Sequence, residues 1–161
     1  MPFPFEIFRA NQAPRLEETD MMSAPEFADE AGPEALANGS YREKSTAAQR
    51  VTVPFVQQGD GAMSLLLGDF APGFTVWRHS HSLDCLYYIV AGEAHLGSQK
   101  LGPGDGFFVP ADHPYTYTAG PDGVKVLEIR NGTQFDMQVL ETDMKRYTEK
   151  AEALLDAHAK T

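Results

Sequence analysis

Short apolar or alternating runs follow one another closely through the middle of the chain, between about residues 50 and 134. Val, Ile, Tyr, Phe and Thr dominate these runs, as they do in β-strands. The runs are VTVPFVQ, AMSLLLGDF, FTVWRHSH, CLYYIVAG, EAHLG, GFFVP, YTYTA and VKVLEIR. Turn-forming residues separate them, for example at 58–61, 102–106 and 120–123. No helical stretch lies between the runs, which excludes parallel βαβ units and predicts an all-β antiparallel barrel or sandwich.

The two ends of the chain have a different character. Residues 1–49 are rich in Ala, Glu and Pro and predict an arm with one or two short helices, lying across the barrel or across a partner subunit. Residues 135–161 predict a C-terminal segment with an amphipathic helix, since apolar residues recur there at steps of three and four. These residues are Leu140, Met144, Tyr147, Ala151, Leu154 and Leu155. We expect this apolar stripe to pack on the outside of the barrel or in a dimer interface.

Length, composition and charge narrow the class of protein. The chain has 161 residues, 42% of them hydrophobic, which favours one domain with a buried core. A net charge of −10 argues against binding to nucleic acid or to an anionic membrane. No apolar run approaches the roughly 20 residues of a membrane-spanning helix. The start of the chain lacks the features of a secretory signal, and one cysteine cannot form an internal disulfide. We therefore expect a cytoplasmic protein.

Two histidines, His79 and His81, stand two residues apart in the run FTVWRHSH. Side chains two apart on a strand point the same way, roughly 6.5 Å apart along the chain. Two imidazoles on one face can converge on one metal ion. Trp77 shares that face, so an aromatic surface is predicted beside the pair.

Two glycine-spaced motifs resemble those of the cupins. The stretch G-FTVWR-HSH-SLD-C-LYYIVA-G, which begins at Gly73 and ends at Gly92, resembles the first cupin motif. The stretch G-DGFFV-P-A-D-HP-Y, which contains Pro110, resembles the second. The resemblance implies a cupin double-stranded β-helix barrel of the RmlC-like jelly-roll kind. It also implies a homodimer and, in the metal-binding cupins, a metal ion held by three His and one Glu.

The sequence departs from this pattern at the ligand positions. Cys85 stands where the motif has Glu, and Tyr115 stands where it has the last His. Asp112 replaces the Gly of the second motif, and the histidine of that region, His113, lies two residues early. Thiolate and imidazole together suit Zn, Fe or Cu, so His79, His81 and Cys85 are the candidate metal ligands. Alternatively, Cys85 is a small buried hydrophobic residue.

The remaining candidates complete a small-molecule pocket. Trp77, Tyr87 and Tyr117 are predicted to line it, and Tyr115 or His113 to handle protons or to position a substrate. Two functions stay open. The first is an enzyme of the dioxygenase, isomerase or lyase type, dependent on a divalent transition metal (Fe, Zn, Mn, Ni or Cu) and acting on a small organic molecule. The second is a ligand-binding or sensing barrel with a degenerate metal site or none.

Overall fold

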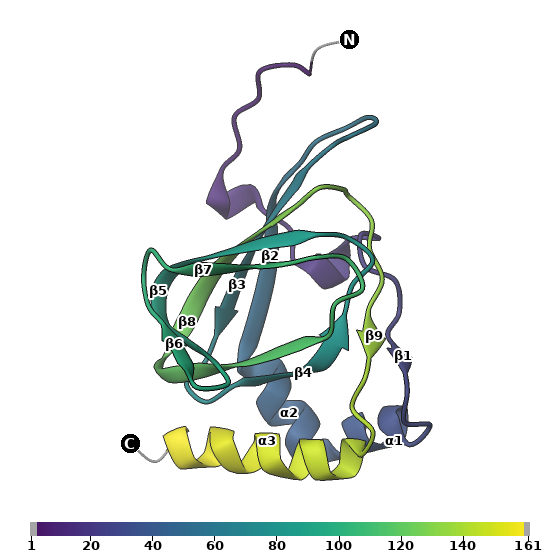
Figure 1. Ribbon diagram of the computed structural model, residues 1–161, viewed down its shortest axis with the longest axis vertical. Helices are drawn as coiled ribbons and strands as arrows, with labels where there is room; N and C mark the ends of the chain where they lie inside the picture. The colour runs from purple at the N-terminus through teal and green to yellow at the C-terminus, as the bar shows by residue number, and fades with distance from the viewer. Residues whose placement is uncertain (1–2, 160–161) are drawn as a thin grey trace.

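The computed structural model describes residues 3–159, and strands make up most of its regular structure (Figure 1). The strands are β1 (Glu26–Phe27), β2 (Gln49–Val56), β3 (Ser64–Phe70), β4 (Thr75–Ser80), β5 (Cys85–Leu96), β6 (Gln99–Leu101), β7 (Gly106–Val109), β8 (Tyr115–Arg130) and β9 (Gln138–Val139). The helices are α1 (Gly32–Leu36), α2 (Gly39–Ala47) and α3 (Met144–Ala159), and two 3-10 turns span Ala10–Gln12 and Leu16–Glu18. The mainly β fold with a C-terminal helix is thus confirmed.

All nine strands belong to one sheet. One path runs in the order β1-β9-β4-β8-β3-β2, and β5 pairs with β8 on one edge and with β6 and β7 on the other. The pairings are antiparallel, except that β1 and β9 run parallel. Within residues 3–159 these pairings do not close into a ring, so closure of the barrel stays a prediction.

The longest strand, β8, corrects one sequence prediction. Residues 120–123 predicted a turn, but the strand continues through them over 16 residues. The reason is tertiary: β8 pairs with β4 in its first part, with β3 in its second part, and with β5 along the other edge. A register shift between Gly92 and Ala94 of β5 takes up the extra residues. In the same way, the predicted runs CLYYIVAG and EAHLG join to form β5.

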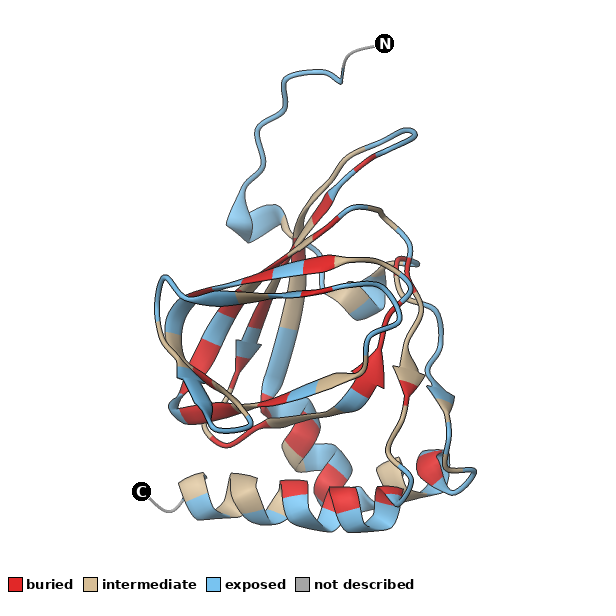
Figure 2. Cartoon of the chain, viewed as in Figure 1, coloured by how far each residue is buried: buried red, intermediate tan, exposed pale blue. Residues whose placement is uncertain are grey.

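Alternation along β8 builds one side of the core. Tyr117, Ala119, Val124 and Val126 are buried, whereas Lys125 between the two valines is exposed. The buried residues form one cluster that also includes Phe70, Phe74, Ile89 and Cys85. Figure 2 shows buried residues along the strands and on the parts of α2 and α3 that face the sheet. The core therefore lies within the curve of the sheet.

Helix α3 buries the central part of the apolar stripe that the sequence predicted, whereas Leu140 precedes the helix, and Leu154 and Leu155 are half-buried. Met144, Tyr147 and Ala151 are buried and pack in one cluster with Tyr41 of α2 and Val139 of β9. The helix lies beside α1 and α2, below the sheet in Figure 1. No helix among residues 3–159 is long and apolar enough to cross a membrane.

The N-terminal arm lies along its own chain. The Val53 amide of β2 donates to the carbonyl oxygen of Pro14 (2.8 Å), and the Phe135 amide donates to that of Met21 (2.8 Å). Further along, β1 pairs with β9. The arm thereby covers hydrogen-bonding groups at the edge of β2 that would otherwise be free to pair with another chain.

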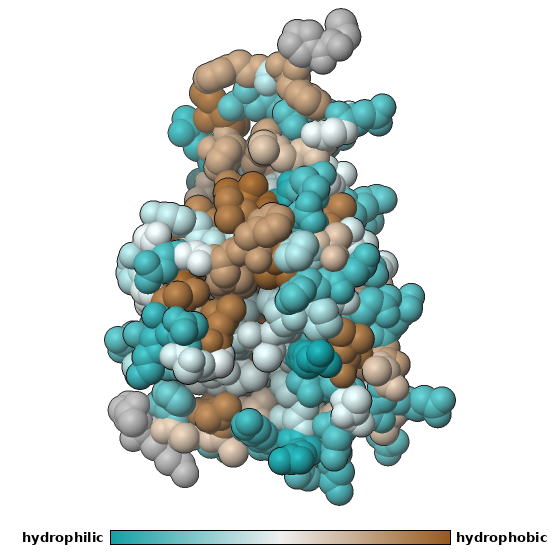
Figure 3. All heavy atoms as spheres, viewed as in Figure 1, coloured by the Kyte–Doolittle hydropathy of each residue, from teal (hydrophilic) through white to brown (hydrophobic). Residues whose placement is uncertain are grey.

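Apolar side chains are exposed at several places on the surface, including the N-terminal arm and the outer face of β5 and β7 (Figure 3). Phe5 and Ile7 of the arm are 92% and 69% exposed. On the outer face of β5 and β7, Leu86 and Phe108 are cross-strand neighbours, and both are exposed. The predicted homodimer would offer such surfaces a partner, and it stays a prediction.

Gly92 gives a test of the fold. Its φ is +75°, and a Cβ atom there would lie 2.1 Å from the carbonyl oxygen of Gly123. Gly97 also has a positive φ (+58°), but a Cβ atom there would have no neighbour within 4 Å. We expect Gly97→Ala to cost about 1 kcal/mol through its left-handed backbone alone. Gly92→Ala should cost about 1 to 3 kcal/mol more, because the backbone must move.

Urea unfolding of both variants and of the wild-type protein measures the difference. Equal destabilisation of the two variants would contradict the close approach of β5 and β8 at this point.

Candidate functional site

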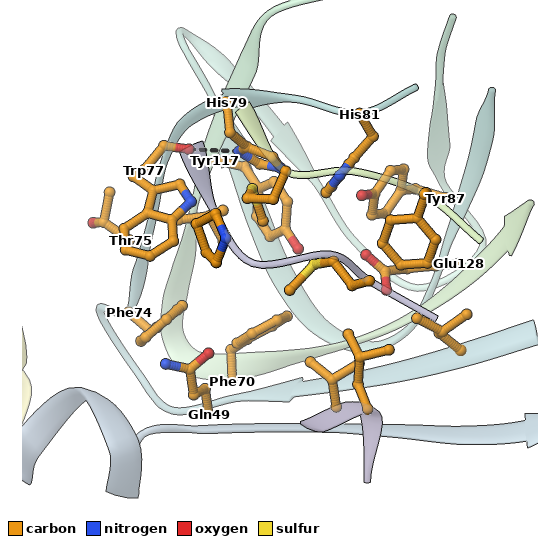
Figure 4. A pocket seen from close by; sticks show the side chains of 18 of the residues that line it. Gln49, Phe70, Phe74, Thr75, Trp77, His79, His81, Tyr87, Tyr117 and Glu128 are labelled. Carbon is orange, nitrogen blue, oxygen red and sulfur yellow. Dashed lines mark hydrogen bonds between the residues drawn. The ribbon is translucent and has the colours of Figure 1, made fainter. Parts of the chain in front are cut away.

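A cavity of about 280 Å³ lies within the curve of the sheet (Figure 4). Its walls come from β2, β3, β4, β5 and β8, from the N-terminal arm and from α2 and α3, and most of the lining residues are apolar. The polar and aromatic side chains of the wall include Thr75, Trp77, His79, His81, Tyr87, Tyr117, Glu128 and Arg130. The cavity thus has the apolar lining and the few polar groups that are typical of small-molecule sites.

The two histidines lie together on one wall of this cavity. His79 comes from β4 and His81 follows the end of the strand, and their ring centroids are 4.8 Å apart. The Nδ1 atom of His79 is 2.6 Å from the carbonyl oxygen of Trp77, and that of His81 is 2.6 Å from the carbonyl oxygen of Asp136. A carbonyl oxygen only accepts, so each Nδ1 carries the proton and donates it. In each neutral ring, Nε2 therefore remains an acceptor.

Burial keeps both imidazoles uncharged. It lowers the pKa of His79 to about 4 and that of His81 to about 3, and the positive charge of Arg130 adds to both shifts. The hydrogen bonds to the two carbonyl oxygens act in the opposite direction but are outweighed. At neutral pH the wall presents two uncharged hydrogen-bond acceptors.

These lowered pKa values predict a loss of stability in acid. The unfolded histidines take up protons below about pH 6.5, whereas the folded ones resist protonation down to about pH 4. The unfolded state binds more protons in that interval, so the free energy of unfolding falls as the pH falls from about 6.5 towards 4. We expect this contribution to be on the order of a few kcal/mol for the pair.

Urea unfolding at several pH values tests this expectation. The double variant His79→Gln/His81→Gln keeps the acidic residues that titrate in the same range, so it serves as the control. If the free energy of unfolding of the wild-type protein falls no more steeply with decreasing pH than that of the double variant, the imidazoles are not held neutral.

Two tyrosines join the histidine wall. The Tyr115 ring lies 4.3 Å from the His79 ring, centroid to centroid, and its hydroxyl forms a hydrogen bond with the Tyr87 hydroxyl. Burial raises the pKa of both phenols above the ordinary range. Both therefore stay protonated and act as hydrogen-bond donors. Tyr87 and Tyr117 line the cavity, as does Trp77.

Cys85 and His113 lie outside the cavity wall, although Cys85 packs in the same core cluster as Tyr87. Cys85 is 1% exposed, belongs to the main core cluster and is absent from the cavity wall. Burial raises the pKa of its thiol to about 12, which keeps the sulfur protonated at neutral pH. His113 is exposed on the loop before β8 and also lies outside the cavity wall. Of the eight residues that the sequence proposed, five therefore line the cavity, Tyr115 contacts two of them from beside it, Cys85 is packed in the core, and His113 lies on the surface.

Asp112 supports the alignment of the second motif. It is the one non-glycine residue within 3–159 that has a positive φ, +62°. The cupin motif has Gly at this position, and Asp tolerates the left-handed conformation better than most residues. The Asp112 amide donates to the carbonyl oxygen of His81 (2.7 Å). This turn therefore also holds the backbone of the second histidine.

Two charged residues of the site, Glu128 and Arg130, were not among those predicted from the sequence. They are 8% and 2% exposed, and both line the cavity. The signal was present in VKVLEIR, because the alternation that buries Val124 and Val126 continues to Glu128 and Arg130. A charged pair in phase with buried valines points inward.

Arg130 is incompletely paired. Its Nη2 atom is 3.6 Å from Oε1 of Glu128, which is longer than a hydrogen bond. Its Nε and Nη1 atoms are buried with no acceptor among the described residues. The Phe135 ring, 4.2 Å from the guanidinium carbon, provides a cation–π contact. Burying a guanidinium with so few partners lowers the stability of the folded protein.

The metal site implied by the cupin resemblance fits these residues only in part. The histidine tautomers are those of metal ligands, which commonly donate Nδ1–H to a carbonyl oxygen. However, no group of three or more His, Cys, Asp and Glu side chains within residues 3–159 is placed to hold a metal ion. The positive charge of Arg130 also acts on both imidazoles and would oppose a second cation. The four-ligand site of the family is not formed here.

No protein-family model and no curated protein sequence matches the chain. Similar solved structures include oxalate decarboxylase from Bacillus subtilis (15% identity, TM-score 0.48), which aligns over 53% of this chain and 25% of its own. The DMSP lyase DddQ from Ruegeria pomeroyi (21%, TM-score 0.47) aligns over 54% of this chain and 48% of its own. An RmlC-like cupin from Shewanella frigidimarina (21% identity, TM-score 0.44) aligns over 52% of this chain and 75% of its own. This chain therefore spans about a quarter of the decarboxylase and about half of the lyase. Each of these alignments covers about half of this chain, and the Shewanella frigidimarina structure is described as an RmlC-like cupin.

Proposed function

We propose that this chain binds a small organic molecule in the cavity and that His79 and His81 contact it directly. The volume of about 280 Å³ suits a molecule of the size of a substituted benzene ring. The apolar walls favour an apolar body, and the polar groups on one wall would fix its orientation.

One observation carries this proposal: both histidines use Nδ1–H on main-chain carbonyl oxygens. Their Nε2 atoms are consequently two fixed acceptors on the wall of a largely apolar cavity. An acceptor that a bound ligand covers without supplying a donor costs free energy. A ligand hydroxyl or N–H group would supply that donor.

Phenol and toluene provide a matched pair of probes, because they differ by a hydroxyl in place of a methyl group. We expect His79→Leu or His81→Leu to weaken phenol binding about tenfold, since the buried hydroxyl then loses its acceptor. Toluene should bind the variants at least as tightly as the wild-type protein. Trp77, the chain's single tryptophan, lines the cavity and reports occupancy through its fluorescence.

The control is His95→Gln, which replaces a histidine that pairs with Glu93 and is not among the residues of the cavity wall. His95→Gln should change neither the affinity for phenol nor the affinity for toluene. Parallel losses of phenol and toluene in the His79 and His81 variants would mean that the imidazoles shape the cavity without accepting from the ligand.

A metal-dependent enzyme is the second candidate, and the histidine tautomers favour it as well. Neutral rings with Nδ1–H on a carbonyl oxygen are prepared to bind a metal ion through Nε2. A metal held by His79 and His81 would supply Lewis-acid or redox chemistry of the dioxygenase, isomerase or lyase type. The Tyr115 ring, which packs against the His79 ring, would then help to position that imidazole.

Metal content separates the two candidates. We expect protein purified without an affinity tag or chelator to carry far less than one equivalent of any transition metal, because only two ligands are placed. Elemental analysis of the wild-type protein and of His79→Ala measures this. One equivalent of metal in the wild-type protein that is lost in His79→Ala would contradict direct ligand binding by the histidines and would support the metal-dependent enzyme.

A further inference from the structure

We propose that Glu128 and Arg130 together recognise an uncharged ligand group that carries a hydrogen-bond donor and an acceptor side by side, such as an amide, lactam or urea. This inference rests on the proposed function, since it names the class of molecule that would occupy the same cavity. It gives a role to two buried charged residues that the histidine wall leaves unexplained.

The two residues are neighbours by strand geometry. They lie two apart on β8 and so project to the same side of the sheet. Tyr87 of β5, which also lines the cavity, is the cross-strand partner of Glu128. The strand thus places a carboxylate and a guanidinium next to each other on the cavity wall.

Their hydrogen-bonding capacity is largely unused. The separation of 3.6 Å between Oε1 of Glu128 and Nη2 of Arg130 gives an ion pair without a hydrogen bond. Within residues 3–159, neither side chain has another hydrogen-bond partner, and Nε and Nη1 of Arg130 are buried without one. Side chains that are buried to this extent normally satisfy their donors and acceptors. A ligand with a carbonyl oxygen beside an N–H group matches a guanidinium N–H beside a carboxylate oxygen.

The charge of the site favours an uncharged ligand. The positive charge of Arg130 and the negative charge of Glu128 cancel, so the pair brings no net charge to the cavity wall. A carboxylate or an ammonium group would bring a net charge into a cavity with mostly apolar walls, which is unfavourable without a counter-ion. An amide brings the same directional groups without that cost.

The remaining walls suit a flat apolar body. Phe70 and Phe74 stack with ring centroids 5.0 Å apart, and the Tyr117 ring meets Phe70 edge to face. All three rings line the cavity, as does Trp77 (Figure 4). An aromatic amide is therefore a suitable probe for the whole cavity.

The first experiment uses the wild-type protein and probes of one shape: benzamide, acetophenone, benzoate and protonated benzylamine. Isothermal titration calorimetry at pH 7 measures each affinity. We expect benzamide to bind about tenfold more tightly than acetophenone, which keeps the carbonyl oxygen but has a methyl group for the N–H donors. Benzamide should also bind more tightly than either ion.

The second experiment changes the charge of the site. Glu128→Gln leaves Arg130 as the one charged member of the pair, so benzoate should become the tightest of the four probes. Arg130→Gln leaves Glu128, so benzylamine should become the tightest. Asp69→Asn is the matched control, since it removes a carboxylate from an exposed ion pair with Lys125 (3.8 Å). It should leave the order of the four probes unchanged.

The outcomes separate this inference from the proposed function. Suppose that probes bind and change Trp77 fluorescence. This inference is then wrong, and the proposed function stands, if acetophenone binds as tightly as benzamide or if neither charge variant changes the order of the four affinities. If no probe binds the wild-type protein or the charge variants, both fail. If the charge variants do not fold, the wild-type comparison of benzamide with acetophenone decides alone.

Discussion

The register of β8 is the constraint on which both the core and the candidate site depend. The strand hydrogen-bonds to β3 and β4 along one edge and to β5 along the other. Val124 and Val126 lie in the core, and period-two geometry then carries Glu128 and Arg130 to the same side. A slip of one residue would release the charged pair to solvent but would expose both valines. The free energy of burying the apolar half of the strand therefore holds two charges inside the cavity wall.

The chemistry of the histidine pair follows from that charge. Burial lowers the pKa of both imidazoles and the charge of Arg130 adds to it, so His79 and His81 stay neutral. Their Nδ1 atoms are fixed on carbonyl oxygens, which leaves Nε2 as an acceptor in each ring. The wall consequently combines weakly basic acceptors with an ion pair whose donors are largely unused. Such a wall suits recognition of an uncharged polar group better than general acid–base catalysis at neutral pH, which needs a pKa near that pH.

The sequence was informative where local pattern and tertiary structure agree. Alternation predicted the strands, and the His-x-His spacing placed His79 and His81 on one wall. The prediction of a turn at residues 120–123 was wrong because Gly, Pro and Asp are local signals, and pairing on both edges of β8 outweighs them. Strand parity put Cys85 inside with Tyr87, and both are buried. The cavity reaches only Tyr87, and how deep a cavity extends depends on packing that parity does not describe.

The cavity wall is divided between parts of the chain with different roles. The sheet provides the polar groups, which β4 and β8 hold at fixed positions through their hydrogen bonds. The N-terminal arm and α2 provide apolar lining, including Leu16, Met22 and Tyr41. The arm is held to the rest of the chain by main-chain hydrogen bonds, such as those from Val53 to Pro14 and from Phe135 to Met21, and by the pairing of β1 with β9. The apolar lining that the arm adds is therefore part of the same hydrogen-bonded structure that positions the polar groups on the sheet.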